Sequence, residues 1–246
     1  MKKPGIYYEI TMPINRYRAA TVGERATAQS GTRMMMPKLL SFTLLATALC
    51  TAQVPSGRWD GTVQIGGLKA PFRIDFEGTA DNFKASLVNA YARASSTSGT
   101  FADGKLRLSF AAAKLDATLT DGELKGTFNG TNTFTASAFC SCGYEGEAGP
   151  DIAGTWDVPS TGWRLEIRKT GEDTLATVKR TTDEIGPLRG RFDGLAFSLH
   201  YFDGTRAAIL DIEPNKAGGL ELTWSEPSLD AKKLNAIPAK PKQVSQ

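Results

Sequence analysis

The chain has 246 residues, of which 41% are hydrophobic and 22% are charged. This balance is typical of a globular protein with one sizeable core or two small ones, and it excludes a disordered or fibrous chain. The formal charge is +3, but seven of the 29 Lys and Arg and only two of the 26 acids lie within residues 1–52. The remainder is therefore near neutral and has no basic stripe, so we do not expect it to bind DNA or RNA.

The N-terminal segment predicts export. Residues 1–33 have no apolar period and precede a better start, so we interpret them as an upstream start assigned too early, and as disordered. Residues 34–52 have the pattern of a signal peptide, because Lys38 precedes an apolar run that is too short to span a bilayer. Cleavage before Gln53 would leave a periplasmic or extracellular protein without a transmembrane segment.

From Gln53 onward, apolar and polar residues alternate almost everywhere, for example over residues 72–76, 83–87 and 106–110. This period of two is typical of strands that have one buried face and one solvent-exposed face. Turn dipeptides separate many of the segments, and they include Asp103-Gly104, Asp121-Gly122 and Asn129-Gly130. Such dipeptides accept the positive φ angles of tight hairpins. The sequence therefore predicts an all-β, antiparallel meander.

Landmarks of the first half recur in the same order in the second half. The pairs are Gly57-Arg58-Trp59 with Gly154-Thr155-Trp156, Gly99-Thr100-Phe101 with Gly190-Arg191-Phe192, Leu106, Leu108 and Phe110 with Phe197, Leu199 and Tyr201, and Leu124 and Phe128 with Leu220 and Trp224. We expect a tandem duplication of a roughly seven-stranded unit. It forms either two small barrels or sandwiches or one larger closed barrel, and the sequence leaves that choice open.

This duplication predicts the order of the segments. They are repeat 1 over residues 53–133, a hinge over 134–153 that carries a Cys-x-Cys pair, repeat 2 over 154–226, and a Pro/Lys-rich linker or tail over 227–246. The four Trp residues fall at the starts of the copies, in a strand and near the end of a copy. We interpret them as core residues rather than as platforms for a ligand.

The two cysteines of the hinge, Cys140 and Cys142, are the ones that remain after cleavage. In an oxidising compartment they are expected to form a disulfide. The small ring that a Cys-x-Cys bridge closes would be comparatively easy to reduce, so a redox role is an alternative to a static bridge or a bridge between chains. We favour a structural role because no Cys-x-x-Cys accompanies the pair.

Other candidate sites are weaker. A lone His200 cannot complete the four ligands of a zinc site, so no metal and no cofactor are expected. The turn with Asp203 and Arg206 could bind an anion, although a hairpin alone explains its Asp-Gly. His200, Asp203 and Arg206 are therefore kept as a candidate loop site, and no catalytic residue is assigned.

Three features together resemble the N-terminal extension of exported bacterial thiol-disulfide oxidoreductases of the TlpA-like, AhpC/TSA redoxin type. They are the β-unit opened by Gly-x-Trp, the Cys-x-Cys with the segment AGPDIAGTW over residues 148–156, and the segment LHYFDGTRA over residues 199–207. The resemblance covers roughly residues 56–238. In that family a Pro-rich segment, which residues 237–242 resemble, leads to a thioredoxin-fold domain that carries the activity and its Cys-x-x-Cys.

The resemblance implies a non-catalytic accessory module, which is either a fragment that lacks its thioredoxin-fold domain or a β-module that exists alone, and we favour the fragment. Its partner would be a thioredoxin-fold domain in the full-length chain or a separate protein. Two alternatives stay open: a free-standing, lipocalin-like secreted barrel that binds a small apolar ligand, and an enzyme with a site built from loops. A barrel interior wide enough for a ligand would favour the first, and a cleft where acids converge on His200 would favour the second.

Overall fold

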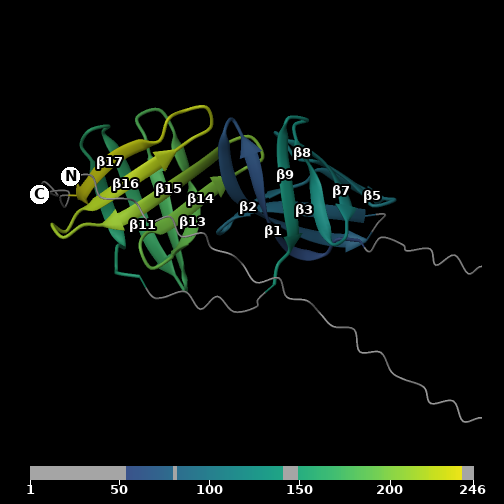
Figure 1. Cartoon of the computed structure of the whole chain (residues 1–246), viewed down its shortest axis with the longest axis horizontal. Helices are drawn as coiled ribbons and strands as arrows, with labels where there is room; N and C mark the ends of the chain where they lie inside the picture. The colour runs from purple at the N-terminus through teal and green to yellow at the C-terminus, as the bar shows by residue number, and fades with distance from the viewer. Residues whose placement is uncertain (1–53, 80–81, 141–148, 240–246) are drawn as a thin grey trace, which may run out of the picture. The chain divides into compact units, whose positions relative to one another are not determined.

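The computed structural model describes residues 54–79, 82–140 and 149–239 (Figure 1). Within these ranges the chain forms seventeen antiparallel strands and no helix, which confirms the all-β prediction. Accordingly, the described residues contain no helix that could cross a membrane. The strands fall into two sheets in chain order, so the predicted pair of smaller units is present rather than one larger barrel. The predictions for the early start and the signal peptide concern residues outside the described ranges.

The first sheet has the order β4-β3-β2-β1-β9-β8-β7-β6-β5. Its strands are β1 (Gly57–Ile65), β2 (Leu68–Thr79), β3 (Asn82–Asn89), β4 (Ala92–Ser95), β5 (Ser98–Ala102), β6 (Lys105–Ser109), β7 (Lys114–Thr120), β8 (Glu123–Phe128) and β9 (Asn132–Ala138). Neighbours in the chain pair through short turns, and β1 also pairs with β9. The meander therefore returns to its own first strand.

β4 and β5 act as one strand that bends between its two partners. The backbone N–H of Ser96 donates to the carbonyl of Ala85 in β3 at 2.7 Å, and that of Thr97 donates to the carbonyl of Ser109 in β6, also at 2.7 Å. A side chain at Gly99 would lie 2.5 Å from the carbonyl oxygen of Phe83, so this close approach requires glycine. The sheet thus curls until its two ends meet at the bend.

The second sheet is a closed barrel of eight strands, and we call it the second barrel because it is the second of the two β units in the chain. They are β10 (Gly154–Val158), β11 (Trp163–Thr170), β12 (Asp173–Lys179), β13 (Glu184–Phe192), β14 (Phe197–Phe202), β15 (Ala207–Pro214), β16 (Leu220–Ser225) and β17 (Lys232–Pro238). Closure runs from β10 to β17, where Trp156 lies opposite Pro238 and Asp157 opposite Ile237. A closed barrel leaves no unpaired strand edge.

The landmarks of the repeat occupy matching places in the two sheets. The indole Nε1 of Trp59, in the first strand of the first sheet, donates to the carbonyl of Ser56 at 3.2 Å. Trp156, in the first strand of the second barrel, likewise donates to the carbonyl of Ile152 at 3.0 Å. Each indole hydrogen bond therefore links the residues just before the first strand to that strand.

The paired glycines of the repeat also match. Gly99 lies opposite Leu108, and Gly190 lies opposite Leu199. If β4 and β5 are counted as one bent strand, both pairs join the fourth and fifth strands of their sheets. The strand order therefore repeats, with nine and eight strands where roughly seven were predicted.

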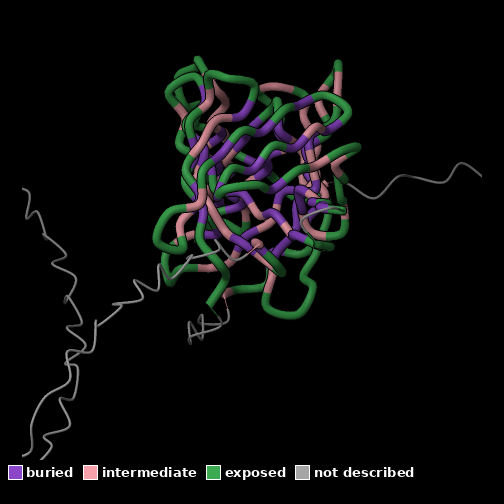
Figure 2. The backbone as a smooth tube through the Cα atoms, turned by 90° about the vertical axis from the view of Figure 1, so that its right-hand side faces the viewer, coloured by how far each residue is buried: buried purple, intermediate pink, exposed green. Residues whose placement is uncertain are grey.

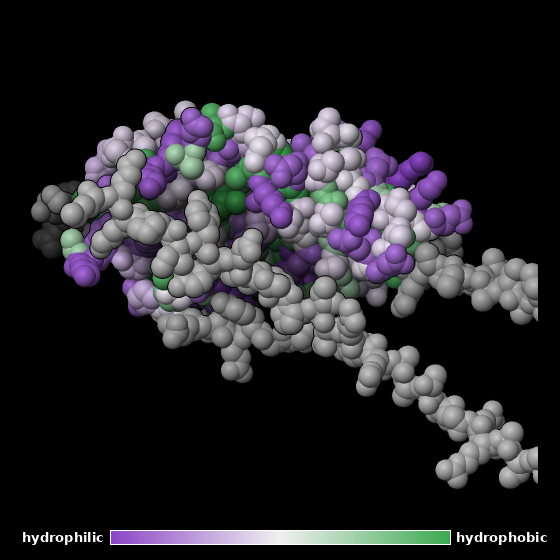
Figure 3. All heavy atoms as spheres, viewed as in Figure 1, coloured by the Kyte–Doolittle hydropathy of each residue, from purple (hydrophilic) through white to green (hydrophobic). Residues whose placement is uncertain are grey.

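Burial alternates along the strands of both sheets, as Figure 2 shows. The second barrel is filled by its own side chains, among them Trp224, Leu165 and Leu188, each of which is at most 2% exposed. Trp59 and Trp224 are buried, and Trp156 and Trp163 pack against the second core, so all four tryptophans serve the cores as predicted. On the face shown in Figure 3, hydrophilic residues are spread over both sheets.

Two residues of the second barrel belong to the core of the first sheet. Phe202 of β14 and Ala207 of β15 are 1% and 3% exposed within that cluster. The ring of Phe202 lies 4.8 Å from that of Phe128 and 5.6 Å from that of Phe72, centroid to centroid. The side chain of Asn89 accepts from the N–H of Phe202 at 3.1 Å and donates to its carbonyl at 2.9 Å. The wall of the second barrel thus completes the first core.

Two predicted segment boundaries are corrected. β9 continues to Ala138 and pairs with β1, so repeat 1 reaches into the predicted hinge. β17 is the closing strand of the barrel and lies within the predicted linker or tail. Its inward residue Ala236 is 1% exposed and Leu234 packs against the core, but the surrounding Lys and Pro residues hide this alternation.

Candidate ligand-binding cleft between the two sheets

Asp60 of β1 holds two arginines in the first sheet. Arg58 donates to it from Nη2 at 2.6 Å and Arg73, its cross-strand neighbour, donates from Nε at 3.1 Å. Burial acts to raise the pKa of Asp60, but the hydrogen bonds and charges of the two arginines outweigh it and hold the pKa below its ordinary value. Asp60 therefore stays charged and fixes both guanidinium groups.

Asp173 of β12 repeats this arrangement in the second barrel. Arg189 donates to it from Nε at 2.8 Å and Arg191 donates from Nε at 3.0 Å. Burial again opposes the hydrogen bonds of the two arginines, and the pKa of Asp173 is lowered on balance. Each sheet thus presents two arginines that share one aspartate.

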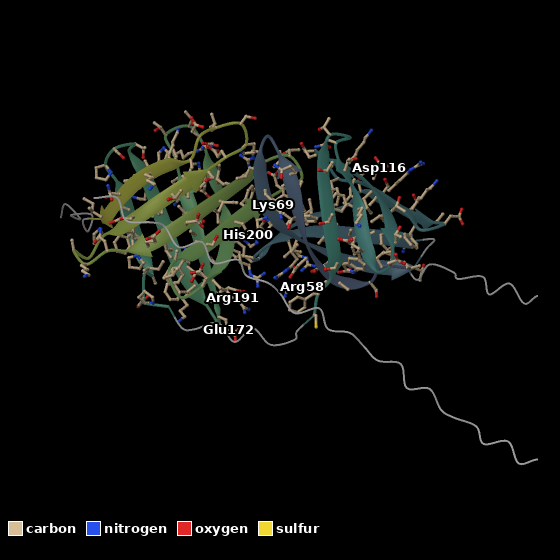
Figure 4. All side chains as sticks on the ribbon, viewed as in Figure 1. Arg58, Lys69, Asp116, Glu172, Arg191 and His200 are labelled. Atoms are coloured by element: carbon tan, nitrogen blue, oxygen red, sulfur yellow. The ribbon has the colours of Figure 1, made fainter. Side chains whose placement is uncertain are left out.

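His200 lies near one arginine of each pair, Arg189 and Arg73. It stands opposite Arg189 in the β13–β14 register, on the outward phase of β14. Burial first, and then the charges of Arg189 and Arg73, lower the pKa of His200 to about 4, although Asp60 and Asp173 act in the opposite direction. Figure 4 labels His200 and Arg191 on the second barrel and Arg58 on the first sheet. His200 is therefore neutral near pH 7, in a region of positive potential.

A hollow of about 430 Å³ opens beside these residues, and we call it the arginine cleft. The first sheet contributes Arg73 of β2 with Ala90 and Tyr91 of the β3–β4 turn, and the second barrel contributes Arg168, Thr170, Asp173, Leu175 and Arg189. Three guanidinium groups thus surround the hollow together with one carboxylate. The lining therefore carries an excess of positive charge, and such an excess favours anions.

Several guanidinium donors in the cleft have no partner among the described residues. Arg73 uses only Nε for its bond to Asp60, which leaves Nη1 and Nη2. Arg168 has a single distant contact, 4.0 Å from Glu166, and its side chain is 74% exposed. A guanidinium carries five N–H donors in a planar fork that fits carboxylate or phosphate oxygens. The cleft therefore offers free donors as well as charge.

The predicted loop site is divided by the structure, which corrects the expectation that its members act together. Asp203 and Arg206 do meet, with Arg206 Nε donating to Asp203 at 3.2 Å, and Tyr201 donating its hydroxyl to the same carboxylate at 2.9 Å. His200 instead faces Arg73 and Arg189. Successive side chains of a strand point to opposite faces, so Tyr201 enters the second core while His200 points outward.

The carboxylate of Asp203 is occupied with building its turn. One oxygen accepts the backbone N–H groups of Thr205 at 2.9 Å and Arg206 at 2.7 Å. Burial acts to raise the pKa of Asp203, but these hydrogen bonds prevail and lower it. Gly204 of the same turn accepts a hydrogen bond from Asn129 of the first sheet at 3.1 Å. This turn therefore joins the two sheets.

The remaining predicted sites are less informative. Cys140 follows β9, and Cys142 lies outside the described residues, so the disulfide and its role stay predictions. In the described part of the chain, no three His, Cys, Asp or Glu side chains are grouped so as to hold a metal ion. A second hollow, of about 160 Å³, lies beside residues 149–153, which cover the second barrel where Phe192 and Phe197 stand.

Sequence reasoning missed the arginine cleft. Composition indicated a near-neutral chain, because the acidic residues after residue 52 balance the basic ones. The signal available for the cleft was that Arg73, Arg168 and Arg189 all alternate with apolar residues and so fall on the solvent-facing side of their strands. The sequence does not say which strands of the two sheets meet. Comparison with protein-family models found no match, and comparison with curated proteins found none either. The resemblance to redoxin extensions therefore stays a prediction.

Proposed function

We propose that this chain is a non-catalytic binding module that holds a small anionic ligand in the arginine cleft. The observation that carries the proposal is the set of three guanidinium groups around one hollow of about 430 Å³, with Asp173 as the sole carboxylate of its lining. This volume lies within the range of roughly 300 to 1,000 Å³ that is typical of small-molecule sites.

The cleft is held in a defined shape before any ligand binds. Asp60 and Asp173 fix Arg73 and Arg189, whose side chains are 18% and 16% exposed. Burial and the nearby charge of Arg189 lower the pKa of Arg73, which indicates that the two cations repel each other across the cleft. An anion would relieve this repulsion, and little side-chain freedom would be lost on binding.

An accessory role beside a thioredoxin-fold domain is compatible with such a module, and it is proposed on the resemblance of the sequence alone. The lipocalin-like alternative needs a cavity inside the barrel, whereas Trp224, Leu165 and Leu188 occupy the interior of the second one. An external cleft that takes an anion therefore fits the geometry better than an internal cavity that takes an apolar ligand. The enzyme alternative needs a cleft where acids converge on His200. The acids that act on His200 are Asp60 and Asp173, and each of them is held by two arginines.

The test is calorimetric titration of the purified protein with benzoate and with inorganic phosphate at low salt. Arg168→Gln removes a largely exposed cation and should weaken binding about tenfold, which corresponds to 1.4 kcal/mol. The matched control is Arg107→Gln on β6, whose side chain is 76% exposed and lies outside the cleft. The affinity should also fall as salt is added, because exposed charges are screened.

Two results would overturn the proposal. One is the absence of heat and of thermal stabilisation with either anion, since a ligand that binds only the native state must stabilise it. The other is an equal loss of affinity in Arg168→Gln and Arg107→Gln, which would indicate a general charge effect rather than a site.

A further inference from the structure

We propose, on the basis of the function proposed above, that the ligand of the arginine cleft is an aromatic carboxylate. Its ring would lie against the side chain of Tyr91, and its carboxylate would take the free donors of Arg73 and Arg168.

Tyr91 is exposed to solvent in a turn that lacks the residues usually found in two-residue hairpins. Its side chain is 72% exposed, although it is a large aromatic residue. It forms a two-residue turn with Ala90, whose φ is 54°, a region that a residue with a Cβ seldom adopts. The other two-residue turns that the structure describes in full all contain glycine; they are Gly66-Gly67, Asp103-Gly104, Asp121-Gly122 and Gly171-Glu172.

This difference indicates a function for the turn. Hairpins at these positions favour Gly, Asn or Asp, and the sequence uses such residues elsewhere in the same sheets. A departure from local preference, together with local strain, is most often found at a functional site. Folding of the hairpin does not require tyrosine at position 91, so its display over the cleft calls for another explanation.

Tyr91 belongs to the first sheet but lies over the outer face of the second barrel. It lines both the arginine cleft and a smaller adjoining hollow of about 130 Å³, and Arg168 and Leu175 line both with it. Tyr91 therefore stands at the boundary between the two hollows. No ring of the described residues stacks on Tyr91 and no described cation lies over it, so its π face is open.

The residues that share the arginine cleft with Tyr91 suit a flat ring with a carboxylate, whereas the smaller hollow is also lined by Glu166 and Glu184. Leu175 and Ala90 provide apolar wall, and the exposed guanidinium of Arg168 can lie over the face of an aromatic ring. Arg73 and Arg189 supply charge on the side of the cleft nearest His200. An anion without a ring would bind the arginines but make no stacking contact with Tyr91, whereas an apolar ring without a charge would leave the arginines without an anionic partner.

The experiment compares three anions by calorimetric titration: 2-naphthoate, its saturated analogue decahydro-2-naphthoate, and inorganic phosphate. We expect 2-naphthoate to bind at least about tenfold more tightly than decahydro-2-naphthoate, because both have one carboxylate and two fused rings but only one offers a π face. Tyr91→Ala should remove most of that advantage, and Tyr91→Phe should keep it. Leu195→Ala is the control, since Leu195 is 84% exposed in a turn outside the cleft lining.

The outcomes separate this inference from the proposed function. Equal affinities for the three anions, unchanged in Tyr91→Ala, would overturn the aromatic ligand and leave the anion site standing. No binding of any of the three would overturn both. Tight binding of 2-naphthoate that depends on Tyr91 but not on Arg168 would support the aromatic contact and overturn the anion site.

Discussion

The lone histidine of the chain makes the electrostatics of the junction between the sheets directly measurable. His200 is the one His of the sequence, and its pKa in the folded protein is lowered to about 4 from an ordinary value of 6.5. The unfolded chain therefore binds a proton between these two values that the folded chain does not bind. Stability is then highest above pH 6.5 and is lost as the pH falls towards 4.

The size of this effect follows from the difference between the two pKa values. The whole difference corresponds to about 3 kcal/mol, reached near pH 4, and roughly 2 kcal/mol of it is lost between pH 7 and pH 5. For a protein of this size that loss lowers the midpoint of thermal unfolding by about 4 to 8 °C. Asp60 and Asp173 have lowered pKa values, so their own titration falls at more acidic pH.

The perturbation is His200→Gln, which keeps a polar side chain without a titrating group. Urea unfolding of both proteins at pH 7, 6 and 5 should give a free energy of unfolding that falls more steeply with acid in the wild type. The carboxylates contribute equally to both proteins and cancel in the comparison. An NMR titration of the single imidazole gives the pKa itself.

Equal pH dependence in the two proteins would refute the reasoning, as would an imidazole pKa near 6.5. Ligand binding provides a further check. An anion in the arginine cleft would offset the charges of Arg73 and Arg189 and should raise the pKa of His200. A pKa that stays constant while ligand saturates the protein would place the ligand elsewhere.

Three further predictions concern the packing and the processing of the chain. Phe202→Ala should lower the free energy of unfolding by about 3 to 5 kcal/mol, because it opens a cavity in the core of the first sheet, whereas Leu195→Ala should change it by less than about 0.5 kcal/mol; similar urea midpoints for the two variants would contradict this. Protein purified without reductant should show no free thiol, and Cys140→Ser with Cys142→Ser should cost less than about 2 kcal/mol in thermal melts, since so short a loop constrains the unfolded chain little; two reactive thiols would count against the bridge. N-terminal sequencing of protein from the cell envelope should begin at or near Gln53, and an intact Met1 would disprove the predicted cleavage.

Local patterns along the chain were sufficient for the class of fold. Alternation of apolar and polar residues is a property of each strand by itself, and turn dipeptides such as Asp121-Gly122 set the pairing of strands that are neighbours in sequence. The repeat could be recognised for the same reason, because Gly99 and Gly190 each serve a close approach between adjacent strands. The limit of such patterns appears at β17, where Lys and Pro conceal the inward phase of Leu234 and Ala236.

The candidate site depended on contacts between residues that are far apart in the chain. The alternation along β14 places Phe202 and His200 on its outward phase, where solvent would be the ordinary neighbour. The fold instead buries Phe202 in the first core and brings His200 beside Arg73 of the other sheet. A period of two says which face of a strand a side chain occupies, but only the packing of one sheet on another says whether that face meets water, a core or an opposing charge. The sequence by itself therefore determined the class of fold and the hairpins between neighbouring strands, and the tertiary structure decided where the arginines converge.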